Sequence, residues 1–213
     1  MGIPVLVFGK SGVGKSYSLR NFEPEQLGVI RVIKKPLPFR SKFKPFDSDD
    51  YKQIMNALFK AKTQSLVIDD AGYLTTNEFM RRALEKGYDK FTEMAKNLWN
   101  LISFVSNELP EDKIVYIMMH EDKNDMGDAK VKTIGRMLDE KVCVEGMFTI
   151  VLHAMRSDGK YLFKTQGDGS DIAKSPYGMF NEEIIENDLK VVDNIIREFY
   201  GIEKKKSEVT ENA

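Results

Sequence analysis

The chain has 213 residues, and its hydrophobic content of 42% is enough for a single well-buried core. Its 32 basic and 33 acidic residues leave a net charge of −1, which argues against a protein that coats nucleic acid over its whole surface but allows a local basic groove. Cys143 is the one cysteine and no apolar stretch reaches membrane-spanning length, so we expect a cytoplasmic protein without disulfide, signal peptide or membrane contact.

The first predicted element is a buried strand over residues 3–8, which leads directly into the octet GKSGVGKS at residues 9–16. This octet fits G-x-x-x-x-G-K-[ST], the phosphate-binding loop of nucleoside triphosphatases. Its glycines permit a sharp turn whose N–H groups point inward at an anion, and a helix predicted over residues 15–22 would add its N-terminal partial charge. A glycine-rich turn without a ligand is the alternative. The expected ligand is ATP, contacted by Gly9, Ser11, Gly12, Val13, Gly14, Lys15, Ser16 and Tyr17.

A second strand, predicted over residues 28–33, leads into a basic segment. Residues 31–44 hold six basic side chains and no acid, with Phe39 and Phe43 among them. Cations and aromatic rings on an irregular loop suit single-stranded nucleic acid, whose phosphates and base faces need both. The alternative is a solvated loop whose phenylalanines pack on the core. The expected DNA-binding residues are Lys34, Lys35, Arg40, Lys42 and Lys44.

After a helix predicted over residues 51–62, an apolar strand over residues 65–69 ends in Asp69 and Asp70. Downstream of a phosphate-binding loop, such a strand is typical of a Walker B segment, although many strands simply end in a polar turn. We expect Ser16 and Asp69 to hold Mg²⁺, Asp69 through water. Lys15 would reach the β- and γ-phosphates. We expect Asp70 to act as the catalytic base, with Glu121 as a further candidate.

A long helical pattern over residues 77–109, broken near Gly87, precedes a strand over residues 113–120 that ends in His120. In P-loop proteins, the extra strand before Asp69 marks the class that includes RecA-like and AAA-type ATPases, whose next strand lies between the first two in space. His120 would then reach the γ-phosphate or the attacking water, unless it is an ordinary histidine at a strand end. His153, which ends a strand near residue 153, is expected to be structural.

The last third of the chain supplies weaker signals. Residues 121–132 carry three lysines among several acids and are a second candidate for DNA contact, and a helix is predicted over residues 133–142. A turn at residues 157–159 predicts an antiparallel hairpin formed by strands over residues 147–154 and 160–165. An oligomeric ATPase usually needs a cation from a neighbouring subunit. Lys174 is the preferred candidate for it, with Lys164 and Arg156 as alternatives.

The final helix is predicted over residues 188–200 and stops at Gly201. Alternation of strands and helices predicts an α/β fold in which a mostly parallel sheet, flanked by helices, ends in a β-hairpin. We expect one domain over residues 1–202 and a polar, disordered tail over residues 203–213.

The chain resembles the small RecA-like, AAA-type P-loop ATPases of bacteriophage recombination and replication modules, including single-strand annealing proteins. The resemblance covers nearly the whole chain and rests on Gly9 to Ser16, Leu66 to Asp70, Tyr88 to Phe91, His120, Thr133 to Arg136, Gly146 to Phe148, Lys164 to Gln166 and Ala173 to Pro176. It implies ATP hydrolysis, single-stranded DNA binding and assembly with itself into a ring or filament. The chain departs from the RecA pattern because Lys34 and Lys35, not a glutamate, follow the second strand, which predicts slow hydrolysis.

Four functions follow from these patterns. The first is a DNA-stimulated ATPase that anneals or pairs single strands in recombination, in contact with other phage replication or recombination proteins in the bacterial host cytoplasm. A replication accessory ATPase such as a helicase loader is the second. A small-molecule kinase is disfavoured by the extra strand and by the lack of an arginine-rich lid segment. A nucleotide-switched binding module without turnover is the fourth.

Overall fold

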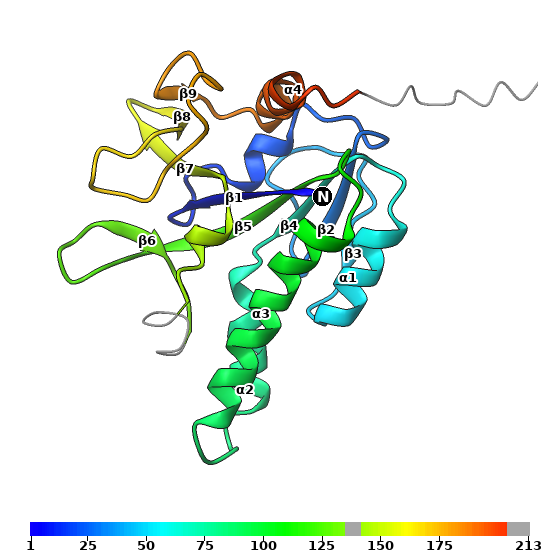
Figure 1. Ribbon diagram of the computed structural model, residues 1–213, viewed down its shortest axis with the longest axis vertical. Helices are drawn as coiled ribbons and strands as arrows, with labels where there is room; N and C mark the ends of the chain where they lie inside the picture. Colours follow the sequence, from blue (N-terminus) through cyan, green and yellow to red (C-terminus); the bar gives the residue numbers. More distant parts are fainter. Residues whose placement is uncertain (135–141, 204–213) are drawn as a thin grey trace, which may run out of the picture.

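The computed structural model describes residues 1–134 and 142–203. Its fold is α/β, with a mostly parallel mixed sheet flanked by helices (Figure 1). The strands are β1 (Ile3–Gly9), β2 (Leu27–Arg31), β3 (Phe46–Asp47), β4 (Ser65–Asp69), β5 (Ile114–Lys123), β6 (Ala129–Val131), β7 (Ile150–Ser157), β8 (Lys160–Lys164) and β9 (Ile184–Glu186). The α-helices are α1 (Tyr51–Lys60), α2 (Gly72–Arg81), α3 (Asp89–Glu108) and α4 (Leu189–Tyr200), and short 3₁₀ turns form η1 (Ser16–Leu19) and η3 (Glu145–Met147).

The strand order is β3-β2-β4-β5-β1-β7-β8-β9, and β6 pairs with β5. Pairing is parallel from β3 to β7 and antiparallel in β7–β8, β8–β9 and β5–β6. The expected placement of the 113–120 strand is confirmed, because β5 lies between β1 and β4 with His120 aligned to Gly9. The carboxyl ends of these three strands therefore meet at one edge of the sheet.

Alternate residues of each strand point to opposite faces of the sheet, and each face is covered by a separate apolar core. On β1, Leu6 and Phe8 belong to the core under α1, α2 and α3, while Val5 and Val7 belong to the core under η1 and α4. Figure 1 shows α2 and α3 (green) projecting together from one side of the sheet, with α4 (orange-red) on the other. The strands that are buried on both faces are thus almost wholly apolar, as their sequences predicted.

The prediction of a helix over residues 15–22 is wrong. Only the 3₁₀ turn η1 forms there, held by bonds such as Arg20 N–H to the Tyr17 carbonyl, 3.2 Å from N to O. Ser16, Tyr17 and Ser18 are weak helix formers, and Pro24 disfavours helical geometry in the residue before it. A turn of four residues sums few peptide dipoles, so the helix-terminus charge expected beside residues 9–16 is largely missing.

The structure confirms several other predicted helices and strands and changes the bounds of some. The pattern over residues 77–109 corresponds to α2 and α3, whose break includes Gly87 as predicted, although α2 begins earlier at Gly72. The predicted hairpin is confirmed, with β8 antiparallel to β7. The strand predicted from residue 147 begins at Ile150, because η3 occupies the preceding residues. Most of the helix predicted over residues 133–142 and of the tail over residues 203–213 lies outside the described residues.

The predicted last helix is confirmed as α4. The Asp188 carboxylate caps its first turn, and Gly201, with φ of 64°, ends it. On its buried side, Arg197 Nε donates to Asp193 Oδ2 at 2.8 Å and Arg197 Nη2 donates to Ser65 Oγ at 2.9 Å. This ion pair is fully enclosed and fastens α4 to the start of β4.

Candidate nucleotide-binding site

The octet at residues 9–16 leaves the end of β1 as a turn that holds two glycines in the left-handed region. Gly12 and Gly14 have φ of 82° and 97°, which side-chain-bearing residues rarely adopt. Gly14 is also closely packed, because a Cβ there would lie 2.7 Å from Cδ1 of Tyr161 on β8. The glycine spacing of the motif therefore corresponds to real backbone demands in this chain.

Lys15 is held inside this turn. Its Nζ donates to the carbonyl oxygens of Gly9, at 2.6 Å, and Lys10, at 2.8 Å, and lies 3.5 Å from His120 Nδ1. The side chain is 6% exposed, and burial lowers its pKa to about 8 against the attraction of Asp70 and Asp69. A phosphate group in the turn would offer this ammonium a stronger acceptor than neutral carbonyls.

Ser16 and Asp69 meet although 53 residues separate them. Ser16 Oγ donates to Asp69 Oδ1 at 2.8 Å. Burial, followed by the nearby Asp70 charge, raises the pKa of the Asp69 carboxyl. A hydroxyl and a buried carboxylate at this distance are oxygen ligands that fit Mg²⁺, and a cation would stabilise the charged carboxylate.

Asp70 follows Asp69, and its backbone lies in the left-handed region with φ of 58°. Its carboxylate lies between the side chains of Lys35 and His120. Lys35 Nζ forms an ion pair with Asp70 Oδ2, and His120 Nε2 lies 3.4 Å from Asp70 Oδ1. Burial would raise the pKa of Asp70, but the hydrogen bonds from His120 and Lys35 hold it below its ordinary value. The expected catalytic base is therefore in the site, but it is a weak base while Lys35 contacts it.

Lys35 reaches this position from the basic segment at residues 31–44, for which the sequence predicts DNA contacts. Burial opposes its charge, yet the hydrogen bond and attraction of Asp70 raise the pKa of Lys35. Phe39 and Phe43 pack against the core under α4, as the alternative interpretation of this loop expected. The side chains of Lys34, Arg40, Lys42 and Lys44 are exposed, so DNA contact by these four stays a prediction.

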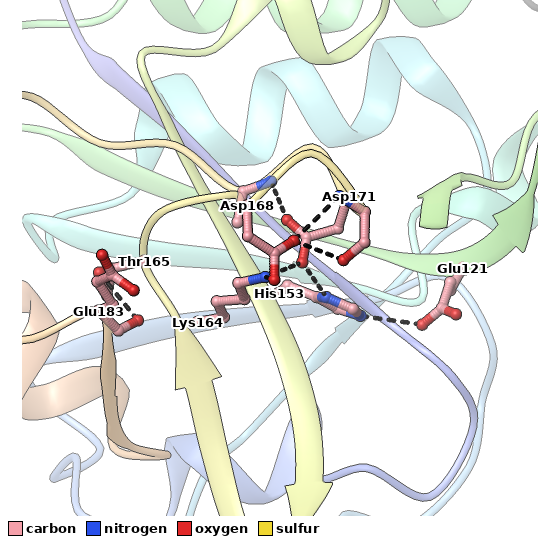
Figure 2. Close-up of polar contacts among 9 residues, drawn as sticks. Glu121, His153, Lys164, Thr165, Asp168, Asp171 and Glu183 are labelled. Carbon is pink, nitrogen blue, oxygen red and sulfur yellow. Dashed lines mark hydrogen bonds and ion pairs between the residues drawn. The ribbon is translucent and has the colours of Figure 1, made fainter. Parts of the chain in front are cut away.

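A second polar cluster lies beside the site and involves two other candidates (Figure 2). His153 Nε2 lies 3.0 Å from Glu121 Oε2, and His153 Nδ1 lies 3.3 Å from Asp171 Oδ2. Lys164 Nζ lies 2.9 Å from carboxylate oxygens of both Asp168 and Asp171. Glu121, the further candidate for the base, is thus engaged with His153. Lys164 is paired with two carboxylates of its own chain, and a role for it toward a neighbouring subunit stays a prediction.

The structure does not bring Lys174 to Lys15 and Asp70. The backbone of Lys174 pairs with Val151, the second residue of β7, with N···O distances of 2.8 and 3.0 Å. Arg156, the other alternative, places its guanidinium over the ring of Tyr161, 5.2 Å from the centroid. A role for Lys174 toward a neighbouring subunit stays a prediction.

Sequence reasoning missed the wall that β8 and the residue after β9 form beside the turn. Tyr161 packs on Gly14, and its ring centroid is 5.3 Å from that of Tyr17. Behind them lies Asn187, fully buried, whose side-chain amide has no hydrogen-bond partner within the described residues. Its Oδ1 would lie 3.4 Å from a Cβ on Gly14. No local pattern marks these residues, because they meet only when the hairpin folds back over the turn.

No protein-family model matches the chain, and a search among curated proteins finds no significant match. Within residues 1–134 and 142–203, no helix is both long and apolar enough to cross a membrane. The same part of the chain contains no group of three or more His, Cys, Asp or Glu side chains placed to hold a metal ion. Mg²⁺ at nucleotide sites uses one or two protein ligands with phosphates and water, so Ser16 and Asp69 remain compatible with it.

Proposed function

We propose that this chain binds ATP with Mg²⁺ at residues 9–16 and hydrolyses it slowly. The observation that carries the proposal is the convergence of Lys15, Ser16, Asp69, Asp70 and His120 at the carboxyl ends of three adjacent strands. Ligands of open α/β sheets bind at this edge. Five groups suited to a triphosphate meet there from three separated segments of the sequence.

Each residue has a separate task in the proposed reaction. Lys15 exchanges the carbonyl oxygens of Gly9 and Lys10 for phosphate oxygens, so its charge gains a partner of opposite sign. Ser16 and Asp69 would hold Mg²⁺, which neutralises charge on the β- and γ-phosphates when bound. His120 lies between Lys15 and Asp70 and can donate to the γ-phosphate.

The ion pair between Lys35 and Asp70 supports slow turnover. A carboxylate that is already paired attracts the proton of an attacking water weakly. The same observation favours one alternative, a nucleotide-switched binding module in which ATP is bound and seldom cleaved. Positioning and charge supply most of the rate in phosphoryl transfer, so a weak base slows hydrolysis without abolishing it.

We further propose that the chain has a RecA-like ATPase fold and acts on single-stranded DNA in recombination, as a homo-oligomer. The position of β5 between β1 and β4 supports this class, together with the sequence resemblance and the exposed lysines and arginine of the basic segment. A helicase loader remains the second candidate, and delivery of helicase to DNA would distinguish it.

The test measures phosphate release from ATP with and without single-stranded oligonucleotide, for the wild type and for Lys15→Met. We expect measurable turnover, stimulation by DNA, and an ATP affinity at least about tenfold lower in Lys15→Met, since a charge-assisted hydrogen bond is lost. A Lys15→Met protein that binds ATP as tightly as the wild type would refute the site. Absence of both DNA binding at low salt and stimulation would refute the recombination role alone.

A further inference from the structure

Tyr161 presents an aromatic ring immediately beside the proposed phosphate site. It lies on β8, packs against Gly14, and forms a tilted pair with Tyr17, the residue that follows Ser16. Both tyrosines are partly buried. A flat ring next to an anion-binding turn suits a ligand with a polyanionic end and a planar end.

Each tyrosine ring has an arginine over it, and the two arginines are held differently. Arg20 lies 4.4 Å from the Tyr17 centroid and is fixed by the Asn187 carbonyl, at 2.5 Å, and by Glu186, at 3.1 Å. Arg156 lies over Tyr161, is exposed, and has no ion-pair partner in the part of the chain that the structure describes. Of the two ring faces under arginines, the one under Arg156 is therefore the easier to open.

We propose that Tyr161 and Arg156 form the nucleobase site, with the base stacked between the phenol ring and the guanidinium. This rests on the proposed function, because it names the other end of the same ligand. Arg156 is displaced outward when the base enters, which its exposure allows. Both groups favour planar π systems, the ring by stacking and the guanidinium by stacking and cation–π attraction.

The chemistry of this clamp defines the class of nucleotide. Stacking does not read hydrogen-bond edges, so the site accepts different bases and ranks them by stacking area. Purine nucleoside triphosphates should therefore bind more tightly than pyrimidine ones, with little distinction between ATP and GTP. Arg156 then serves its own subunit's nucleotide, in contrast to the expectation that it serves a neighbour.

The experiment is calorimetric titration of the full chain with ATP, CTP and sodium tripolyphosphate, each with Mg²⁺. Tripolyphosphate has no base and reports on the phosphate loop alone. We expect Tyr161→Leu to weaken ATP binding about tenfold or more, as for loss of one base–aromatic stack, and to leave tripolyphosphate affinity within about twofold. Tyr161→Phe should retain ATP affinity. Tyr88→Leu, which removes an exposed tyrosine at the start of α3, is the matched control and should change neither ligand.

Several results would overturn the assignment. If Tyr161→Leu weakens both ligands equally, the ring only supports Gly14. If wild-type protein binds ATP no more tightly than tripolyphosphate, the base contributes nothing. Wild-type binding of neither ligand would overturn the proposed function itself, a different failure. If Tyr161→Leu does not fold, Arg156→Ala provides the test, because Arg156 is exposed and its removal should not disturb the fold. This substitution should lower ATP affinity about threefold and leave tripolyphosphate affinity unchanged.

Discussion

The buried charge of Lys15 predicts an unusual dependence of stability on pH. Below pH 8 the ammonium is protonated in both the folded and the unfolded chain, and only the folded chain bears the cost of burying it. Burial lowers its pKa to about 8 in the folded protein from an ordinary 10.5. Between these values the folded chain releases a proton that the unfolded chain keeps, so the free energy of unfolding rises with pH.

The size of the effect follows from the two pKa values. Raising the pH from 7.5 to 9.5 should add about 2 kcal/mol to the free energy of unfolding through Lys15 alone. For a domain of this length that corresponds to a rise in Tm of about 4–8 °C. Other lysines and tyrosines titrate over the same range, so the quantity to examine is the difference between wild type and Lys15→Met.

The assay is urea unfolding of both proteins, without nucleotide, at pH 7.5 and 9.5. We expect the wild type to gain about 2 kcal/mol relative to Lys15→Met over this interval. Wild-type and variant curves that shift in parallel, within about 0.5 kcal/mol, would show that the Lys15 ammonium is not desolvated in the folded chain. That result would also remove the argument that a phosphate relieves its burial.

Three further predictions concern single contacts. Lys35→Met should raise DNA-independent ATP hydrolysis about threefold or more, because Asp70 becomes a stronger base, and an unchanged or lower rate of phosphate release would contradict this. Gly14→Ala should destabilise the chain by about 2 kcal/mol more than Gly12→Ala in urea unfolding. Both glycines have positive φ, but only a Cβ at position 14 would clash with a neighbour, so equal costs would count against the packing on Tyr161. Arg197→Met should cost about 3–5 kcal/mol in the same assay, because it leaves the buried carboxylate of Asp193 on α4 without its counter-ion, and a cost below about 1 kcal/mol would show that this pair is not desolvated.

The sequence predicts structure well where a turn, a strand or a helix end requires particular residue types at nearby positions. The octet at residues 9–16 is recognisable because glycine, lysine and serine are each required at fixed offsets by one turn. The strand that ends in Asp69 is recognisable because burial on both faces requires an unbroken apolar run. The helix α4 was predicted within a residue, since Asp188 and Gly201 supply its start and stop signals.

Local sequence patterns do not predict the structure correctly where several conformations compete over a few residues, or where contacts between distant segments determine the outcome. A helix is predicted over residues 15–22, yet the weak helix formers Ser16 to Ser18 and the short path to β2 leave only η1. The short strands β3, β6 and β9 were not predicted, because two or three residues carry too little pattern. The role of Lys35 was also unforeseen, since its cluster of cations suggested a solvent-facing DNA contact.

By itself, the sequence determined that this chain has a glycine-rich turn that fits a phosphate-binding motif, followed by a carboxylate pair on a buried strand. Only the tertiary structure decided which groups share that site. Lys35 contacts Asp70, and Tyr161 covers Gly14, because strands distant in sequence end at the same edge of the sheet and the last hairpin folds over it. Proximity of this kind depends on strand order and on the path of the connecting loops, which no local residue pattern encodes.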